Sequence, residues 1–209
     1  MKKINKIWIL LCFLGLATTI NAQSNLTIDA SQQYSSFKFT DASGTSLNTE
    51  YTGVFTGAYS LGYRYISEKG IMANGTIGMR KAGANLDYDA MNYTWDLQYF
   101  QSKLGIGYMY KKLRFSPYIT VAGYFGYMLR GFQIVNNEDF NLLKTKSLNE
   151  IDYGIIATPG VQYKISDAIS TYAEFSYLMG LQNLEKDEGQ KSQNLAYGVT
   201  LGLCFSIKK

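Results

Sequence analysis

Large apolar residues alternate with small or polar ones along most of the chain, and this period-two pattern constrains the fold more than any other feature. In residues 194–207 every odd position is large and apolar or aromatic, whereas every even position is small or polar. The same alternation runs through residues 115–129 and 151–165. Successive side chains of a β-strand point to opposite faces, so each segment predicts a strand with two chemically distinct faces.

The alternation occurs in eight segments, which predicts an even number of strands. The five further segments are 26–39, 53–66, 71–81, 95–110 and 169–180. Short connections at 67–70, 111–114 and 166–168 alternate with long polar ones at about 40–52, 82–94, 131–150 and 181–193. This layout is typical of an all-β, eight-stranded antiparallel up-and-down transmembrane β-barrel with short periplasmic turns and long extracellular loops.

Two irregularities interrupt the pattern. Within 95–110 the alternation slips by one residue near Tyr99 and Phe100, which predicts a β-bulge. Pro159 cannot donate a hydrogen bond to a neighbouring strand, and a closed barrel has no free edge to hold it. We therefore expect a second bulge at Pro159, assisted by Gly160.

The chemistry of the two faces distinguishes a membrane barrel from a soluble eight-stranded barrel of the lipocalin type. A soluble barrel places its large apolar side chains inside, around a ligand. Here the bulky apolar face is opposed by Gly, Ala, Ser and Thr, which suit the narrow interior of an eight-stranded barrel. The bulky face is therefore predicted to contact lipid.

Residues 1–22 have the pattern of a secretory signal peptide. Three lysines precede the apolar stretch 7–16, and the small residue Ala22 offers a cleavage site before Gln23. Removal of this segment leaves 17 basic and 16 acidic residues, so the mature chain is nearly neutral. No basic patch remains to favour nucleic acid as a partner. We expect domain 1–22 to be the signal peptide and 23–209 to be the barrel.

The chain contains no histidine, which argues against an enzyme. Histidine-dependent nucleophilic triads and His-ligated metal sites are excluded, and no cofactor-binding or metal-binding motif is present. A Ser–Lys catalytic arrangement would need no histidine, but no Ser-x-x-Lys stands at a loop-facing strand end with a plausible partner. Cys204, the one cysteine after the signal segment, is expected to be a small packing residue in the lumen.

Within one strand, residues of the same parity (odd or even number) point to the same face, and this parity places seven charged residues in the lumen. The lumen of an eight-stranded barrel has room only for side chains. Unpaired charges in such a lumen cost several kcal/mol, so we expect them to form a structural polar network. Glu174 is predicted to contact Lys103 and one of the arginines. The alternative function of these charges is a narrow pore. The seven residues are Arg64, Arg80, Lys103, Arg130, Asp152, Lys164 and Glu174.

The predicted long loops contain ten acidic and four basic residues, so the extracellular end is expected to be acidic. Such charge blocks are solvated or form a contact surface. The expected partners are outer-membrane lipid, lipopolysaccharide, the outer-membrane assembly machinery, and a protein at the extracellular loops or periplasmic turns. The expected location is the outer membrane of a Gram-negative bacterium.

Several stretches of the second half have a shared strand pattern, namely 116–118, 122–123, 151–154, 160–164, 172–177 and 180–183. These stretches resemble the outer membrane protein β-barrel domain family (PorT-like) of the Bacteroidota. This resemblance implies an outer-membrane barrel, and one branch of the family is associated with type IX secretion and gliding. The role of an accessory component of such a machine is therefore a second hypothesis, beside a structural or interaction role. The stretch Thr158-Pro159 departs from the glycine alternation of the family.

Overall fold

The computed structural model describes residues 23–41, 43–46, 50–88, 91–111, 114–186 and 189–207. The predicted signal peptide, including Ala22, lies outside the described residues, and Gln23 is the first residue of β1. The elements are β1 (Gln23–Thr40), β2 (Tyr51–Ile66), β3 (Ile71–Tyr88), β4 (Met91–Met109), β5 (Phe115–Val135), β6 (Glu138–Asn141), α2 (Leu142–Thr145), β7 (Ile151–Lys164), β8 (Ile169–Gly180) and β9 (Lys191–Ile207).

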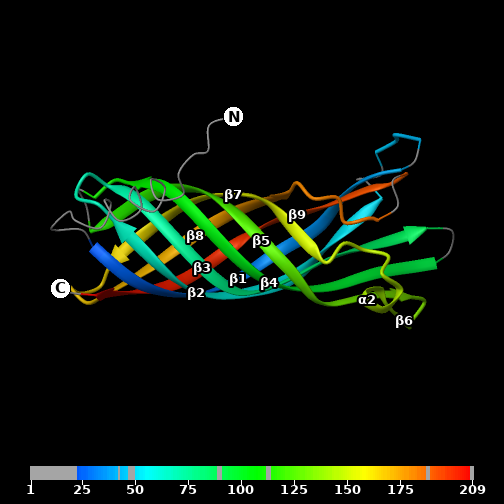
Figure 1. Ribbon diagram of the computed structural model, residues 1–209. Helices are drawn as coiled ribbons and strands as arrows, with labels where there is room; N and C mark the ends of the chain where they lie inside the picture. The colour runs from blue at the N-terminus through cyan, green and yellow to red at the C-terminus, as the bar shows by residue number, and fades with distance from the viewer. Residues whose placement is uncertain are drawn as a thin grey trace, which may run out of the picture.

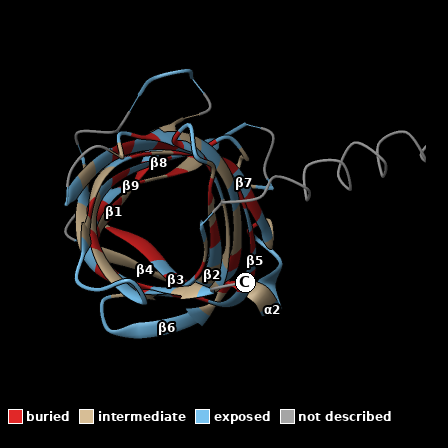
Figure 2. Ribbon diagram, turned by 90° about the vertical axis from the view of Figure 1, so that its left-hand side faces the viewer, coloured by how far each residue is buried: buried red, intermediate tan, exposed pale blue. Residues whose placement is uncertain are grey.

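Eight long strands close into an antiparallel ring, which confirms the predicted fold class. Each strand pairs with its neighbours in the order β4-β3-β2-β1-β9-β8-β7-β5, and pairing between β4 and β5 closes the ring. Seen along its axis, the wall is continuous (Figure 2). The short strand β6 pairs with the end of β5 and lies with α2 at one end of the barrel (Figure 1). None of the described helices is long and apolar enough to cross a membrane.

The outer wall carries the large apolar side chains in a belt that crosses every strand of the ring. Phe55 of β2, Leu104 and Ile106 of β4, and Leu201 of β9 are all well exposed. The residues between them face inward, and these include Thr120 and the other small or polar side chains of each strand. The two faces therefore have the chemistry that the alternation predicted.

The strands extend further at the loop end than the alternation indicated. The hairpin of β3 and β4 continues through most of 82–94, so the prediction of a long loop there is wrong. β5 likewise continues to Val135, and β6 and α2 occupy part of the predicted loop 131–150. In the β3–β4 hairpin the alternation fades because the outward positions are small or polar, and so lack the contrast that reveals a strand. In β5 the bulge at Leu129 instead moves the apolar residues to even positions, at Phe132 and Ile134, so the earlier pattern does not continue.

Only the first of the two predicted bulges is present. Gln98 pairs with Arg130 and Tyr99 pairs with Met128, so the extra residue at this level is Leu129 of β5 rather than a residue of β4. The prediction of a bulge at Pro159 is wrong. The pairing of β7 with β8 lapses at Thr158 and Pro159, but it resumes in the same register. The exposed proline interrupts the ladder without displacing the strand.

Candidate functional site in the barrel lumen

Two buried ion pairs lie at different levels of the lumen and form its polar centre. Four of the seven predicted lumen residues supply them: Arg80 and Asp152 on the loop side, and Arg64 and Glu174 nearer the short turns. Each arginine also lies against two tyrosine rings, at 4.3 to 5.6 Å from the ring centroids. A guanidinium over an aromatic face is stabilised by the negative charge of that face.

The loop-side pair is the more deeply buried. Arg80 donates from Nη2 to Asp152 Oδ2 at 2.8 Å, and the two side chains are 1% and 0% exposed. Asp152 also accepts hydrogen bonds from the hydroxyl of Tyr124 and, at 2.8 Å, from Nδ2 of Asn194. Three donors from three other strands therefore surround one carboxylate. These hydrogen bonds offset part of the cost of removing the charges from water, although Nε and Nη1 of Arg80 have no hydrogen-bond partner among the described residues.

The turn-side pair joins a wider network. Arg64 Nη2 donates to Glu174 Oε1 at 2.7 Å, and the same oxygen accepts a hydrogen bond from Tyr118 at 2.6 Å. Arg64 Nη1 also donates to Gln162 Oε1 at 3.3 Å and lies 4.0 Å from the sulfur of Cys204. Cys204 is thus buried as a packing partner of the arginine.

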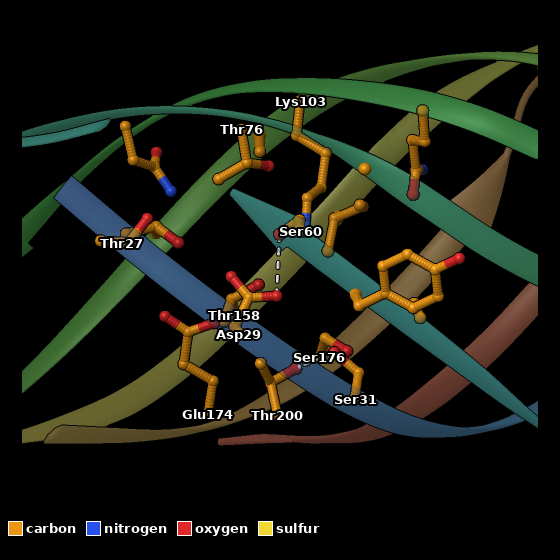
Figure 3. Close-up of a pocket in the computed structure, with 18 of the residues that line it drawn as sticks. Thr27, Asp29, Ser31, Ser60, Thr76, Lys103, Thr158, Glu174, Ser176 and Thr200 are labelled. Atoms are coloured by element: carbon orange, nitrogen blue, oxygen red, sulfur yellow. Dashed lines mark hydrogen bonds between the residues drawn. The ribbon is translucent and has the colours of Figure 1, made fainter. Parts of the chain in front are cut away.

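A small polar chamber of about 50 Å³ lies between the two pairs, and Figure 3 shows its lining. Asp29 accepts hydrogen bonds from Ser60 at 2.8 Å and from Tyr172 at 3.0 Å. Lys103 extends from β4 toward Asp29 and Ser60 across the chamber (Figure 3). Among the described residues, neither Lys103 nor Asp29 forms an ion pair, although both line the same space. The chamber therefore holds opposite charges at a distance from each other.

Apolar clusters cover the polar centre on both sides. Toward the short turns, Ile66, Met72 and Met109 pack with Tyr118. At the loop end a larger cluster combines inward side chains of the strands with residues from α2 and the loops. Its buried members are Phe37, Ala82, Ala84, Leu97, Tyr99, Met128, Leu142, Leu148 and Leu184. The lumen is filled along its length, as expected for eight strands.

Arg130 and Lys164 do not belong to the buried network. The predicted inward direction is wrong for Arg130, whereas Lys164 lines a polar cavity at the turn end of the barrel but is too exposed to join the network. Arg130 is exposed on the outer wall, where its guanidinium lies 4.9 Å from the ring centroid of Phe132. The cause is the bulge at Leu129, which reverses the parity of the residues that follow it in β5. Lys164 is the last residue of β7, and its half-exposed side chain pairs with Asp167 at 2.6 Å.

The list of predicted lumen residues missed several members of the network. Asp29 lies in the first strand, whose alternation is the least regular, and it carries the only buried carboxylate that was not predicted among the described residues. Tyr118, Tyr124 and Tyr172 point inward beside arginines, although no tyrosine was among the seven predicted residues of the network. Their inward parity was the signal that could have identified them. No group of three or more Cys, Asp or Glu that could hold a metal occurs in the described part of the chain.

The fold defined by this ring and its apolar outer belt is that of the small outer-membrane β-barrels. The outer membrane protein OprG of Pseudomonas aeruginosa matches with a TM-score of 0.50 and 9% identity, over 90% of this chain and 96% of that one. A major outer membrane protein from Thermus thermophilus matches with a TM-score of 0.50 and 10% identity, over 88% of this chain and 99% of that one. No family model matches the sequence, and no curated protein matches it.

Proposed function

We propose that the chain is a non-enzymatic outer-membrane β-barrel of a Gram-negative bacterium, with a structural or interaction role. The observation that carries this proposal is the continuous belt of exposed apolar side chains around the ring. A soluble monomer rarely exposes apolar patches of more than a few hundred Å², and a belt across all strands suits the hydrocarbon core of a bilayer. Density-gradient separation of inner and outer membranes tests the location. Recovery in the soluble fraction would refute it.

The filled lumen supports a plugged barrel over a narrow pore. Two ion pairs, a chamber of about 50 Å³ and an apolar cluster at each side occupy the axis. Purified protein in planar lipid bilayers should therefore show no stable unitary conductance. Stable single-channel steps, present with the wild type and altered by Arg80→Met, would establish the pore instead.

The acidic loop end is the proposed contact surface, with lipid and lipopolysaccharide around the wall and the assembly machinery acting during insertion. Exposed Glu138 and Asp139 lie on β6, whose outer edge pairs with no other described strand. Crosslinking in native membranes followed by co-purification tests for a protein partner. Enrichment of secretion or gliding components would favour the accessory role that the PorT-like resemblance implies, and would support membership of that family. Recovery of lipopolysaccharide alone would favour the structural role.

A further inference from the structure

A second cavity opens at the end of the barrel that carries the short turns. Its volume is about 210 Å³, and we call it the turn-end cup. The lining is almost entirely polar. It comprises Gln23, Asn25, Met109, Lys111, Ser116, Gln162, Lys164, Ser166, Asp167, Ser170 and Ser206. The cup lies outside the apolar cluster of Ile66, Met72, Met109 and Tyr118, so it is separate from the chamber between the ion pairs.

The cationic and amide donors of the cup are only partly engaged. Lys111 donates to the carbonyl oxygen of Ser67 at 2.9 Å and forms no ion pair with any described carboxylate. Its partial burial lowers the pKa of the ammonium group, against the opposing effect of Glu68. Gln162 uses Oε1 to accept from Arg64, which leaves its amide nitrogen to face the cup. Lys164 is the second cation, and Asp167 neutralises it.

The charge of the surrounding surface favours the same kind of ligand. The three short connections 67–70, 111–114 and 166–168 contain four basic and two acidic residues, whereas the loops at the opposite end are acidic. Charges of one sign around a polar concavity raise the local concentration of ligands of the other sign. A partly desolvated ammonium group gains most from an anion that reaches it directly, because such charge-assisted hydrogen bonds are the stronger ones.

We infer that the turn-end cup is a binding site for an oxyanion, a carboxylate or phosphate group on a ligand that approaches from the side of the short turns. Lys111 is the principal cation, Gln162 and the hydroxyls of Ser170 and Ser206 supply neutral donors, and Asp167 competes with the ligand for Lys164. Through Gln162 the site contacts Arg64, so an occupied cup touches the lumen network. The inference does not depend on the acidic loops or on a protein partner there.

The test is a titration of the full-length mature protein in detergent micelles, with inorganic phosphate and, separately, acetate, at constant ionic strength. Backbone amide NMR shifts of Ser170 and Ser206 report the cup, and those of Gly44 report the opposite end. We expect saturable shifts at the cup alone, with a dissociation constant of about 1 mM for the better ligand. Saturation by phosphate only would assign a phosphate-bearing ligand, and saturation by acetate would assign a carboxylate.

Three variants test the site by changes in binding: one should weaken it, one should leave it almost unchanged and one should tighten it. Lys111→Met, which keeps the apolar stem, should weaken binding at least fivefold, whereas Lys69→Met, an exposed lysine outside the cup, should change it less than twofold. Asp167→Asn should tighten binding at least threefold because it frees Lys164. Asp167 is exposed, so this variant should fold even if Lys111→Met does not. Equal weakening by both lysine variants, no tightening by Asp167→Asn, or no saturable shift would overturn the inference.

Discussion

The buried pair of Arg80 and Asp152 should dominate the response of the barrel to single substitutions. Arg80→Met leaves Asp152 completely buried, with hydrogen bonds from Tyr124 and Asn194 but no counter-ion. Breaking a buried pair by removing one partner costs about 3–5 kcal/mol, because the remaining charge has no compensation. The substitution also removes the cation–π contact of the guanidinium with Tyr99, whose ring centroid lies 4.9 Å away. This contact contributes about 0.5–2 kcal/mol, which is included in that range. We expect the loss of stability in Arg80→Met to lie in the upper half of the range of about 3–5 kcal/mol.

The assay is urea unfolding of the protein refolded in lipid vesicles, followed by tryptophan fluorescence, as a double-mutant cycle with Asp152→Asn. The double variant should be more stable than the sum of the single losses predicts, with a coupling energy of about 1–3 kcal/mol. The matched control is Lys164→Met, which breaks a pair whose side chains are 52% and 75% exposed and should cost about 0–1 kcal/mol. Equal losses for Arg80→Met and Lys164→Met would refute a desolvated lumen.

Three further predictions use the same unfolding measurement. Val199→Arg places a charge on the outer face of β9 and should cost about 2–4 kcal/mol at mid-membrane, whereas the inward Thr200→Ser should be mild; equal tolerance would mean that the faces are reversed. A Cβ at Gly202 would overlap the ring of Tyr172, so Gly202→Val should cost about 1–3 kcal/mol, and no loss would show that this ring is free to move. Pro159→Val supplies the missing donor toward β8 and should stabilise by about 0.5–1.5 kcal/mol; destabilisation would show that the lapse is needed.

The fold could be predicted from the sequence because the membrane barrel imposes one simple rule on every strand. Lipid outside and a narrow lumen inside require large apolar residues on one face and small or polar residues on the other. Residues 194–207 obey this rule at every position, and they form β9 almost as predicted. The rule weakens where a strand extends past the apolar belt, as 82–88 of β3 does, since outward residues there no longer need to be large. Strand ends are therefore the part that the pattern could not supply.

The site was only partly predictable because parity states the direction of a side chain but not its level along the axis. Arg64 and Glu174 were both expected in the lumen, yet only the three-dimensional stagger of β2 and β8 makes Glu174 a partner of Arg64 rather than of Lys103. The inward tyrosines also favour Arg64 over Lys103 as the partner of Glu174. The rings of Tyr118 and Tyr172 lie 5.0 and 4.3 Å from the Arg64 guanidinium and help to hold it beside Glu174, whereas a lysine ammonium is a point charge without such a planar match.

Arg130 shows how a single residue limits inference from parity. The alternation across 115–129 is regular, but after Leu129 the apolar positions of β5 change from odd to even, at Phe132 and Ile134. This change is the sign that a residue is inserted in β5, because in the partner strand Tyr99 keeps the inward parity of Leu97 and Gln101. The bulge predicted near Tyr99 therefore lies at the right level of the barrel, but its extra residue, Leu129, belongs to β5. Every parity assignment beyond such a point reverses, which is why mid-barrel charges were placed correctly and Arg130 was not.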